Sequence, residues 1–105
     1  MKFSTRSTYG IRILLNLLQQ DNESPVSLAS IAEKEDLSLA YLERIMSTLK
    51  KNNLVLASKG VNGGYTVKPD IENLPIYNVL EILDPNEYTF PCIKKISILL
   101  IIFKN

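Results

Sequence analysis

The residues of this chain best suited to bind another molecule are cations clustered between positions 41 and 68. This stretch holds five Lys and Arg side chains against a single acidic one, Glu43, so its net charge is +4, while the whole chain carries +1. Such a patch favours contact with the phosphate groups of nucleic acids. On charge alone, an ordinary solvated surface is the competing interpretation. The five cations are Arg44, Lys50, Lys51, Lys59 and Lys68.

A glycine-rich tip lies within this basic stretch. Gly60, Gly63 and Gly64 give the backbone access to positive φ and allow another molecule to approach closely. Lys59 adds a positive charge at the tip, and Asn62 adds hydrogen-bonding groups. A cationic tip of this kind is typical of a β-hairpin that contacts DNA. A tight turn without any ligand is the alternative interpretation of Gly63 and Gly64.

The chain offers no arrangement of side chains for catalysis. It contains no His, and Cys92 is its only Cys. Paired-carboxylate motifs, a phosphate-binding loop and metal-ligand spacings are all missing, so we expect the protein not to be an enzyme. A single Cys excludes an internal disulfide, no signal peptide is visible, and no apolar run approaches the roughly 20 residues of a membrane span. We therefore expect a cytoplasmic protein that does not span a membrane.

Periodic apolar residues predict four helices that position these groups. Ser27 and Ser38 are suited to cap the second and third helices, and Pro75 suits the first turn of the fourth. Asp36 lies between the second and third helices, where a residue that tolerates the left-handed backbone region is needed. The helices are expected at about residues 5–20, 28–34, 39–52 and 75–83.

Two strand-like runs, 54–58 and 65–67, flank the glycine tip and predict a hairpin. An isolated hairpin is marginally stable in water, so it must pack against the helices. The order of elements predicts a mainly α fold with a small β-hairpin, the winged helix-turn-helix. We expect this domain to occupy residues 1–84, with the helix-turn-helix at about 28–51 and the wing at about 54–68.

A winged helix-turn-helix protein reads DNA through its third helix and its wing. The third helix fits the major groove with its N-terminal residues at base edges, and the wing lies along the minor groove. Helix N-termini add phosphate contacts. Alternatively, Tyr41 covers the edge of the core, and Glu43 and Arg44 are ordinary solvent charges. The expected DNA-binding residues are Thr5, Arg6, Tyr9, Ser38, Ala40, Tyr41, Glu43, Arg44, Lys51, Lys59, Asn62, Gly63 and Gly64.

Several short motifs together resemble one family of bacterial regulators. They are Met1-Lys2-Phe3-Ser4-Thr5-Arg6 with Tyr9-Gly10, then Pro25-Val26-Ser27-Leu28, Ile31-Ala32, Tyr41-Leu42-Glu43, Leu54-Val55, and Gly60 with Gly63-Gly64-Tyr65. Over about residues 1–84 this set resembles the Rrf2 family, which includes the IscR, NsrR and CymR types. The resemblance implies a dimeric repressor or activator that binds double-stranded DNA at a palindromic promoter site.

Two features depart from the pattern of that family. Its cluster-binding branch carries three cysteines after the fourth helix, whereas only Cys92, which matches the first of them, is present here. Because an iron–sulfur cluster needs about four ligands, we expect no cluster and no other cofactor, which leaves Cys92 as a minor metal-ligand candidate. We also expect the family's long dimerisation helix to be missing. In its place, residues 85–105 form an apolar tail that we interpret as a buried strand, a partner contact or a truncation product.

The sequence therefore predicts a sequence-specific DNA-binding transcriptional regulator, with a homodimeric repressor as the preferred form. The alternative is a winged-helix protein-interaction module, or a degenerate regulator that no longer binds DNA because it no longer dimerises. Salt dependence separates the two, since phosphate contacts release counterions and weaken steeply as the salt concentration rises.

Overall fold

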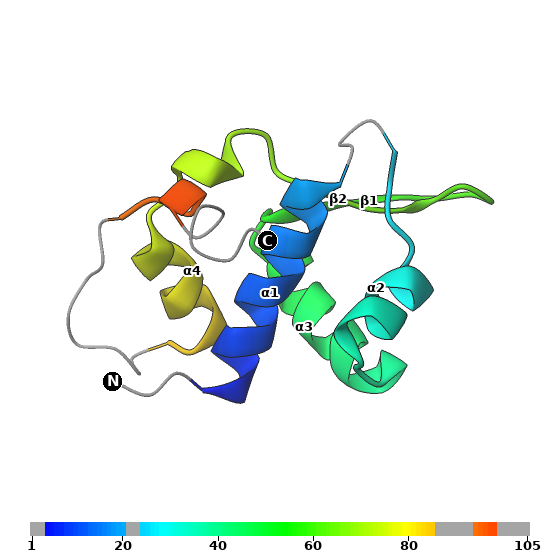
Figure 1. Cartoon of the computed structure of the whole chain (residues 1–105), viewed down its shortest axis with the longest axis horizontal. Coiled ribbons are helices and arrows are strands. Elements are labelled where there is room, and N and C mark those ends of the chain that lie inside the picture. The colour runs from blue at the N-terminus through cyan, green and yellow to red at the C-terminus, as the bar shows by residue number, and fades with distance from the viewer. Residues whose placement is uncertain (1–3, 21–23, 86–93, 99–105) are drawn as a thin grey trace.

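A computed structural model describes residues 4–20, 24–85 and 94–98 of the chain. The described elements follow the predicted order (Figure 1) and confirm the winged helix-turn-helix fold. Both ends of every predicted helix and strand lie within one residue of the observed ends. The elements are α1 (Thr5–Gln19), α2 (Leu28–Glu35), α3 (Leu39–Lys51), β1 (Val55–Ser58), β2 (Gly64–Val67), the short 3-10 helix η1 (Ile71–Asn73) and α4 (Ile76–Leu83).

Serine side chains cap the first three helices. The hydroxyl oxygens of Ser4, Ser27 and Ser38 each accept a hydrogen bond from the backbone N–H three residues later, at 3.0 to 3.2 Å. The predicted caps at Ser27 and Ser38 are thereby confirmed. The prediction for Pro75 was off by one position, because its backbone is extended (ψ 140°) and it lies at the N-cap of α4. Ile76 is instead the first helical residue.

The apolar stripes of the helices meet in one core. Figure 1 shows α1 in the middle of the molecule, with α4 on one side and α2 and α3 on the other. The four-residue stripes of α3 and α4 are buried, as their i, i+3, i+4, i+7 spacing predicts. The buried side chains of these two stripes are Leu42, Ile45, Met46 and Leu49 on α3, and Ile76, Val79, Leu80 and Leu83 on α4.

The hairpin is extended by a single-residue third strand that the sequence did not reveal. β1 and β2 pair antiparallel with Val55 opposite Val67, and both of these side chains are buried. Val26 pairs with Tyr65 at the other edge of β2. The Tyr65 N–H donates to the Val26 carbonyl at 2.8 Å, and the Val26 N–H donates back at 2.9 Å. The wing is therefore held by the segment that leads into α2.

The start of α1 is joined to the end of α4. A Cβ on Gly10 would lie 2.5 Å from a methyl group of Leu83, so α1 and α4 pack closely at this glycine. The carboxylate of Asp84 accepts hydrogen bonds from the hydroxyls of Ser4 and Ser7 at the first turn of α1. These contacts fix α4 against the helix at the centre of the fold.

Part of the predicted tail returns to this core. Ile96 is only 3% exposed, and its N–H donates to the carbonyl of Leu74 at 2.9 Å. Of the three interpretations of the tail, burial therefore holds for Ile96. Cys92 and residues 99–105 lie outside the described residues.

Candidate nucleic-acid interface

The turn between α2 and α3 sets the orientation of α3. Asp36 adopts the left-handed conformation (φ 55°), as its place in the sequence predicted, and the Leu37 N–H donates to the Ala32 carbonyl at 3.0 Å. Ser38 is the N-cap residue before α3, and its hydroxyl oxygen accepts the N–H of Tyr41 at 3.2 Å. The capping role of Ser38 follows from this bond, while its phosphate contact stays a prediction.

One side of α3 points away from the core. Four of the predicted contact residues, Ala40, Glu43, Arg44 and Lys51, are exposed on this side. Because the buried stripe occupies the opposite side, these side chains are positioned to meet a partner. We call this surface the exposed face of α3. It consists of Leu39, Ala40, Glu43, Arg44, Ser47, Lys50 and Lys51.

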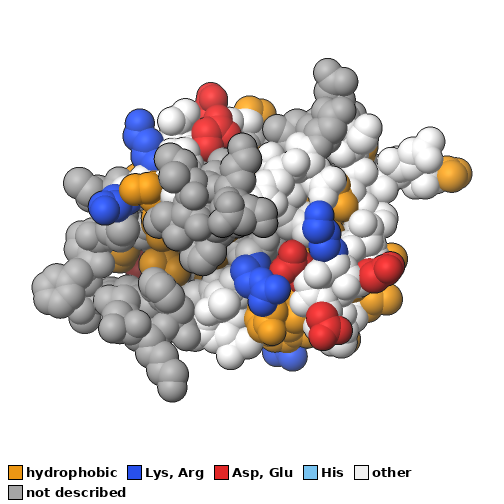
Figure 2. All heavy atoms as spheres, in the orientation of Figure 1, with side chains coloured by type: hydrophobic (Ala, Val, Ile, Leu, Met, Phe, Trp, Pro, Cys, Tyr) orange, Lys and Arg blue, Asp and Glu red, His pale blue; other side chains and the backbone are white. Residues whose placement is uncertain are grey.

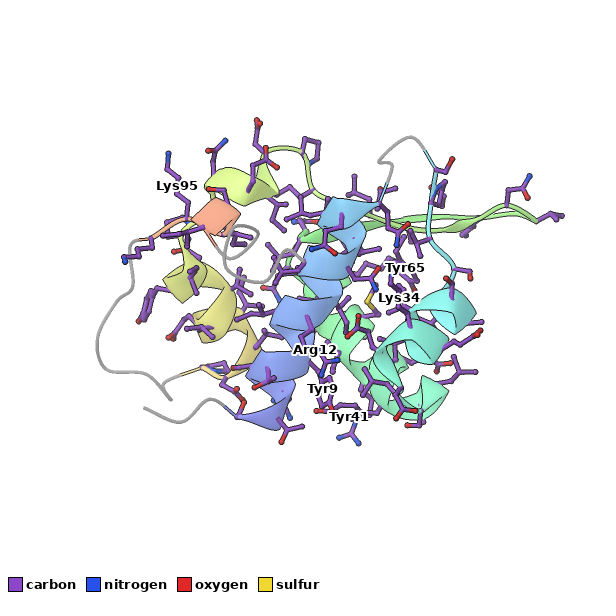
Figure 3. All side chains as sticks on the ribbon, in the orientation of Figure 1. Tyr9, Arg12, Lys34, Tyr41, Tyr65 and Lys95 are labelled. Carbon is purple, nitrogen blue, oxygen red and sulfur yellow. The ribbon has the colours of Figure 1, made fainter. Side chains whose placement is uncertain are left out.

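Two other predicted contact residues, Tyr9 and Tyr41, pack on each other. Their rings meet edge to face, with centroids 6.0 Å apart and planes at 88°. The Arg12 guanidinium lies 5.1 Å from the centroid of the Tyr9 ring, a cation–π distance. Figure 3 shows the three side chains gathered beside α1 and α3. Since both rings are half-buried against the core, the structure supports the interpretation that Tyr41 covers the core's edge; DNA contact by either tyrosine stays a prediction.

Arg12 and Glu35 form a link between α1 and α2 that sequence reasoning missed. Arg12 Nε lies 3.0 Å from Glu35 Oε1. The Asn16 side-chain amide donates to the other Glu35 oxygen, also at 3.0 Å. The spacing of Arg12 and Asn16 by four residues places them on one side of α1, but nothing local in the sequence names Glu35 as their partner. Through Tyr9 and Tyr41, this cluster connects all three helices around the interface.

The wing carries Lys59 and Asn62 at an exposed tip, together with Val61. Figure 2 shows the wing as a narrow arm that projects from the right of the molecule, with a hydrophobic side chain at its end. Gly60 has φ 110°, a conformation that favours glycine and turns the chain at the tip. The positions of Lys59 and Asn62 are therefore compatible with contact to a DNA groove or backbone.

Gly63 and Gly64 are explained by close packing inside the protein. A Cβ on Gly63 would lie 2.3 Å from the Ser58 carbonyl oxygen, and a Cβ on Gly64 would lie 2.4 Å from the Val26 carbonyl oxygen. The turn and the third strand each require a residue without a side chain. This supports the tight-turn interpretation, and DNA contact by the two glycines stays a prediction.

Thr5 and Arg6 lie in the first turn of α1, and both are exposed. Arg6 Nη1 donates to the carbonyl of Leu83 at 3.3 Å and lies 3.9 Å from a carboxylate oxygen of Asp84. The described contacts of Arg6 are therefore with the end of α4 and not with α3 or the wing. A phosphate contact by Thr5 or Arg6 stays a prediction.

These elements match a known family over nearly the whole chain. The model of the Rrf2 family, described as iron-dependent transcriptional regulator, matches residues 3–98. This chain belongs to the Rrf2 family. The family predicted from the sequence motifs is thereby confirmed, and with it the relation to transcriptional regulators.

Curated relatives in the Rrf2 family are longer than this chain. Protein rrf2 of Nitratidesulfovibrio vulgaris is 35% identical over 92 residues, which cover 88% of this chain and 61% of that protein. The HTH-type transcriptional regulator IscR of Serratia proteamaculans is 33% identical over 84 residues, covering 80% and 51% respectively. The chain thus spans about half to three fifths of the length of these relatives.

Solved structures of Rrf2-family regulators share the fold. CymR, the global cysteine regulator of B. subtilis, superposes with a TM-score of 0.77 at 31% identity, covering 86% of this chain and 70% of that one. IscR of T. potens gives a TM-score of 0.73 at 34% identity, covering 86% and 66%. The winged-helix architecture of this chain is therefore that of established transcriptional regulators.

The side chains of this chain do not fit an iron–sulfur cluster. The sequence has one Cys and no His, and four ligands are needed. Over residues 4–20, 24–85 and 94–98, no group of three or more His, Cys, Asp or Glu side chains could hold a metal ion. The absence of a cofactor stays a prediction.

Among those same described residues, no helix is long and apolar enough to cross a membrane.

Proposed function

We propose that this chain is a sequence-specific DNA-binding transcriptional regulator. The observation that carries the proposal is the combination of the exposed face of α3 with a protruding, cationic wing. Figure 1 shows that the wing and the α2–α3 turn project at the same end of the molecule, away from α4. The cations between residues 41 and 68, all exposed, are Arg44, Lys50, Lys51, Lys59 and Lys68.

In this proposal, α3 lies in the major groove and the wing follows the adjacent backbone or minor groove. Ala40, Glu43 and Arg44 meet base edges, because they belong to the first two turns of α3 and point away from the core. Lys51 and Lys59 neutralise phosphates on either side of that contact. The curated relative IscR, an HTH-type transcriptional regulator, supports the same assignment.

We further propose that the protein acts as a homodimeric repressor on a palindromic promoter site. One recognition helix reaches only a few base pairs, so a single copy specifies too short a sequence. Two copies related by a twofold axis read two half-sites spaced by about one helical turn of DNA or a multiple of it. Palindromic binding follows from that symmetry.

Selection of bound duplexes from a random DNA pool tests the proposal. We expect enrichment of a palindrome, and we expect the affinity for it to fall steeply with salt. If all five cations contact phosphates, log K should fall against log salt with a slope of about −4 to −5 per chain. Absence of any enriched sequence, with weak and salt-independent binding, would instead favour the protein-interaction module. Sedimentation of the protein with and without the selected duplex reports the number of copies bound.

A further inference from the structure

Leu39 is a large apolar residue that is exposed at the start of α3. It is the first residue of α3, and 49% of its surface is exposed. The next residue, Ala40, is exposed as well. The leading edge of the exposed face of α3 is therefore apolar, although the rest of that face is polar or charged.

We propose that Leu39 determines specificity by contacting thymine methyl groups in the major groove; this rests on the proposed function. Of the four bases, only thymine presents a methyl group in that groove, and proteins read it through apolar contact. Burial of both apolar surfaces removes them from water and favours binding. The charged groups of Lys and Arg cannot recognise a methyl group in this way. An apolar side chain at position 39 can therefore distinguish thymine from the other bases.

The helix geometry directs Leu39 toward the bases. Side chains of an α-helix tilt toward its N-terminus, so Leu39 extends over the turn at Ser38, beyond the start of the helix. Glu43 lies four residues later on the same side. Arg44 and Lys51 add positive charge farther along the exposed face, which complements the phosphates that flank the groove. Leu39 is thus the first residue of α3 to meet the bases, ahead of Ala40, Glu43 and Arg44.

Replacement of thymine by uracil tests the contact at the level of one methyl group. The probe is the duplex selected from the random pool, with each thymine of a half-site replaced in turn by uracil. We expect one position per half-site at which wild-type protein loses affinity by about fourfold, as removal of one buried methyl group predicts. For Leu39→Ala, the thymine and uracil duplexes should bind equally at that position.

Leu56→Ala is the matched control, because Leu56 is an equally exposed leucine (47%) that lies on β1 and not on α3. It should keep the full preference for thymine. Circular dichroism checks that both variants are folded. If Leu39→Ala binds weakly, the comparison is made at low salt, where phosphate contacts sustain binding. If binding by Leu39→Ala still cannot be measured, Leu39→Val takes its place. Its side chain is one carbon shorter than that of leucine, so it should reduce the preference for thymine over uracil.

The outcomes separate this proposal from the function on which it rests. If the wild-type protein enriches a duplex but no uracil substitution weakens binding, the thymine contact is wrong and DNA recognition stands. A preference for thymine that survives in Leu39→Ala or Leu39→Val also overturns the role of Leu39. If no duplex is enriched, both proposals fall together.

Discussion

Lys59 provides the most direct test of the wing at the scale of one residue. It is exposed at the tip, and no ion pair in the described part of the chain involves it. We expect Lys59→Ala to weaken binding to the selected duplex severalfold and to reduce the salt slope by about 1, because one phosphate contact is lost. The free energy of unfolding should change by less than about 0.5 kcal/mol. Fluorescence anisotropy over a salt series and thermal denaturation measure the two effects.

Lys95→Ala is the control for this substitution. Lys95 is also an exposed lysine, and Figure 3 places it at the end of the molecule opposite the wing. It should bind the duplex with wild-type affinity and slope. An unchanged slope for Lys59→Ala, or an equal effect of the two variants, would contradict a phosphate contact at the wing tip.

Tyr41 allows its two interpretations to be separated by substitution. Its ring packs on Tyr9 and against the core, so Tyr41→Ala should lower the free energy of unfolding by about 1–3 kcal/mol. Tyr41→Phe keeps the ring and should be as stable as wild type in urea denaturation. Weaker DNA binding by Tyr41→Phe at unchanged stability would assign the hydroxyl to DNA. Equal stability of Tyr41→Ala and wild type would refute the packing role.

At the scale of elements, the wing depends on its contact with the third strand. Gly64→Ala should destabilise the protein by about 1–3 kcal/mol, because the added Cβ meets the Val26 carbonyl, a backbone group that cannot rotate away. Gly60→Ala is the comparison, since a Cβ there has no neighbour within 4 Å and only the φ of 110° opposes it. Hydrogen exchange of the Tyr65 N–H, which donates to Val26, should accelerate in Gly64→Ala alone. Equal exchange in both variants would argue against the third strand.

Local patterns in the sequence predicted elements well and contacts between them poorly. The stripes and caps of α2 and α3 are encoded within a few residues of one another, so their bounds could be predicted. The pairing of Val26 with Tyr65 joins positions 39 residues apart, and a single bridging residue leaves no alternating pattern. The same holds for the site: exposure of Arg44 followed from the period of α3, but the packing of Tyr9 on Tyr41 depends on how two helices cross.

At the scale of the whole molecule, contacts distant in sequence tie the interface to the rest of the fold. The bonds from Ser4 and Ser7 to Asp84 hold α4 on α1, and Ile96 completes the core near the start of α4. The tail could not be interpreted uniquely from the sequence, because a run that is apolar on all sides is equally suited to a core or to a partner surface. The burial of Ile96 assigns that residue to the core, and it decides the question for that residue only.

Ile96→Ala tests whether this residue serves the core or a partner. Its side chain is almost fully buried, so we expect a loss of about 2–4 kcal/mol in the free energy of unfolding. Ile98→Ala is the neighbouring control and should cost less, because Ile98 is only partly buried against the same core. Urea denaturation of the two variants gives the comparison. Sedimentation below the unfolding transition should show an unchanged oligomeric state, since a core residue acts within one chain. A variant that dissociates while its subunits stay as stable as wild type would instead make Ile96 a partner contact.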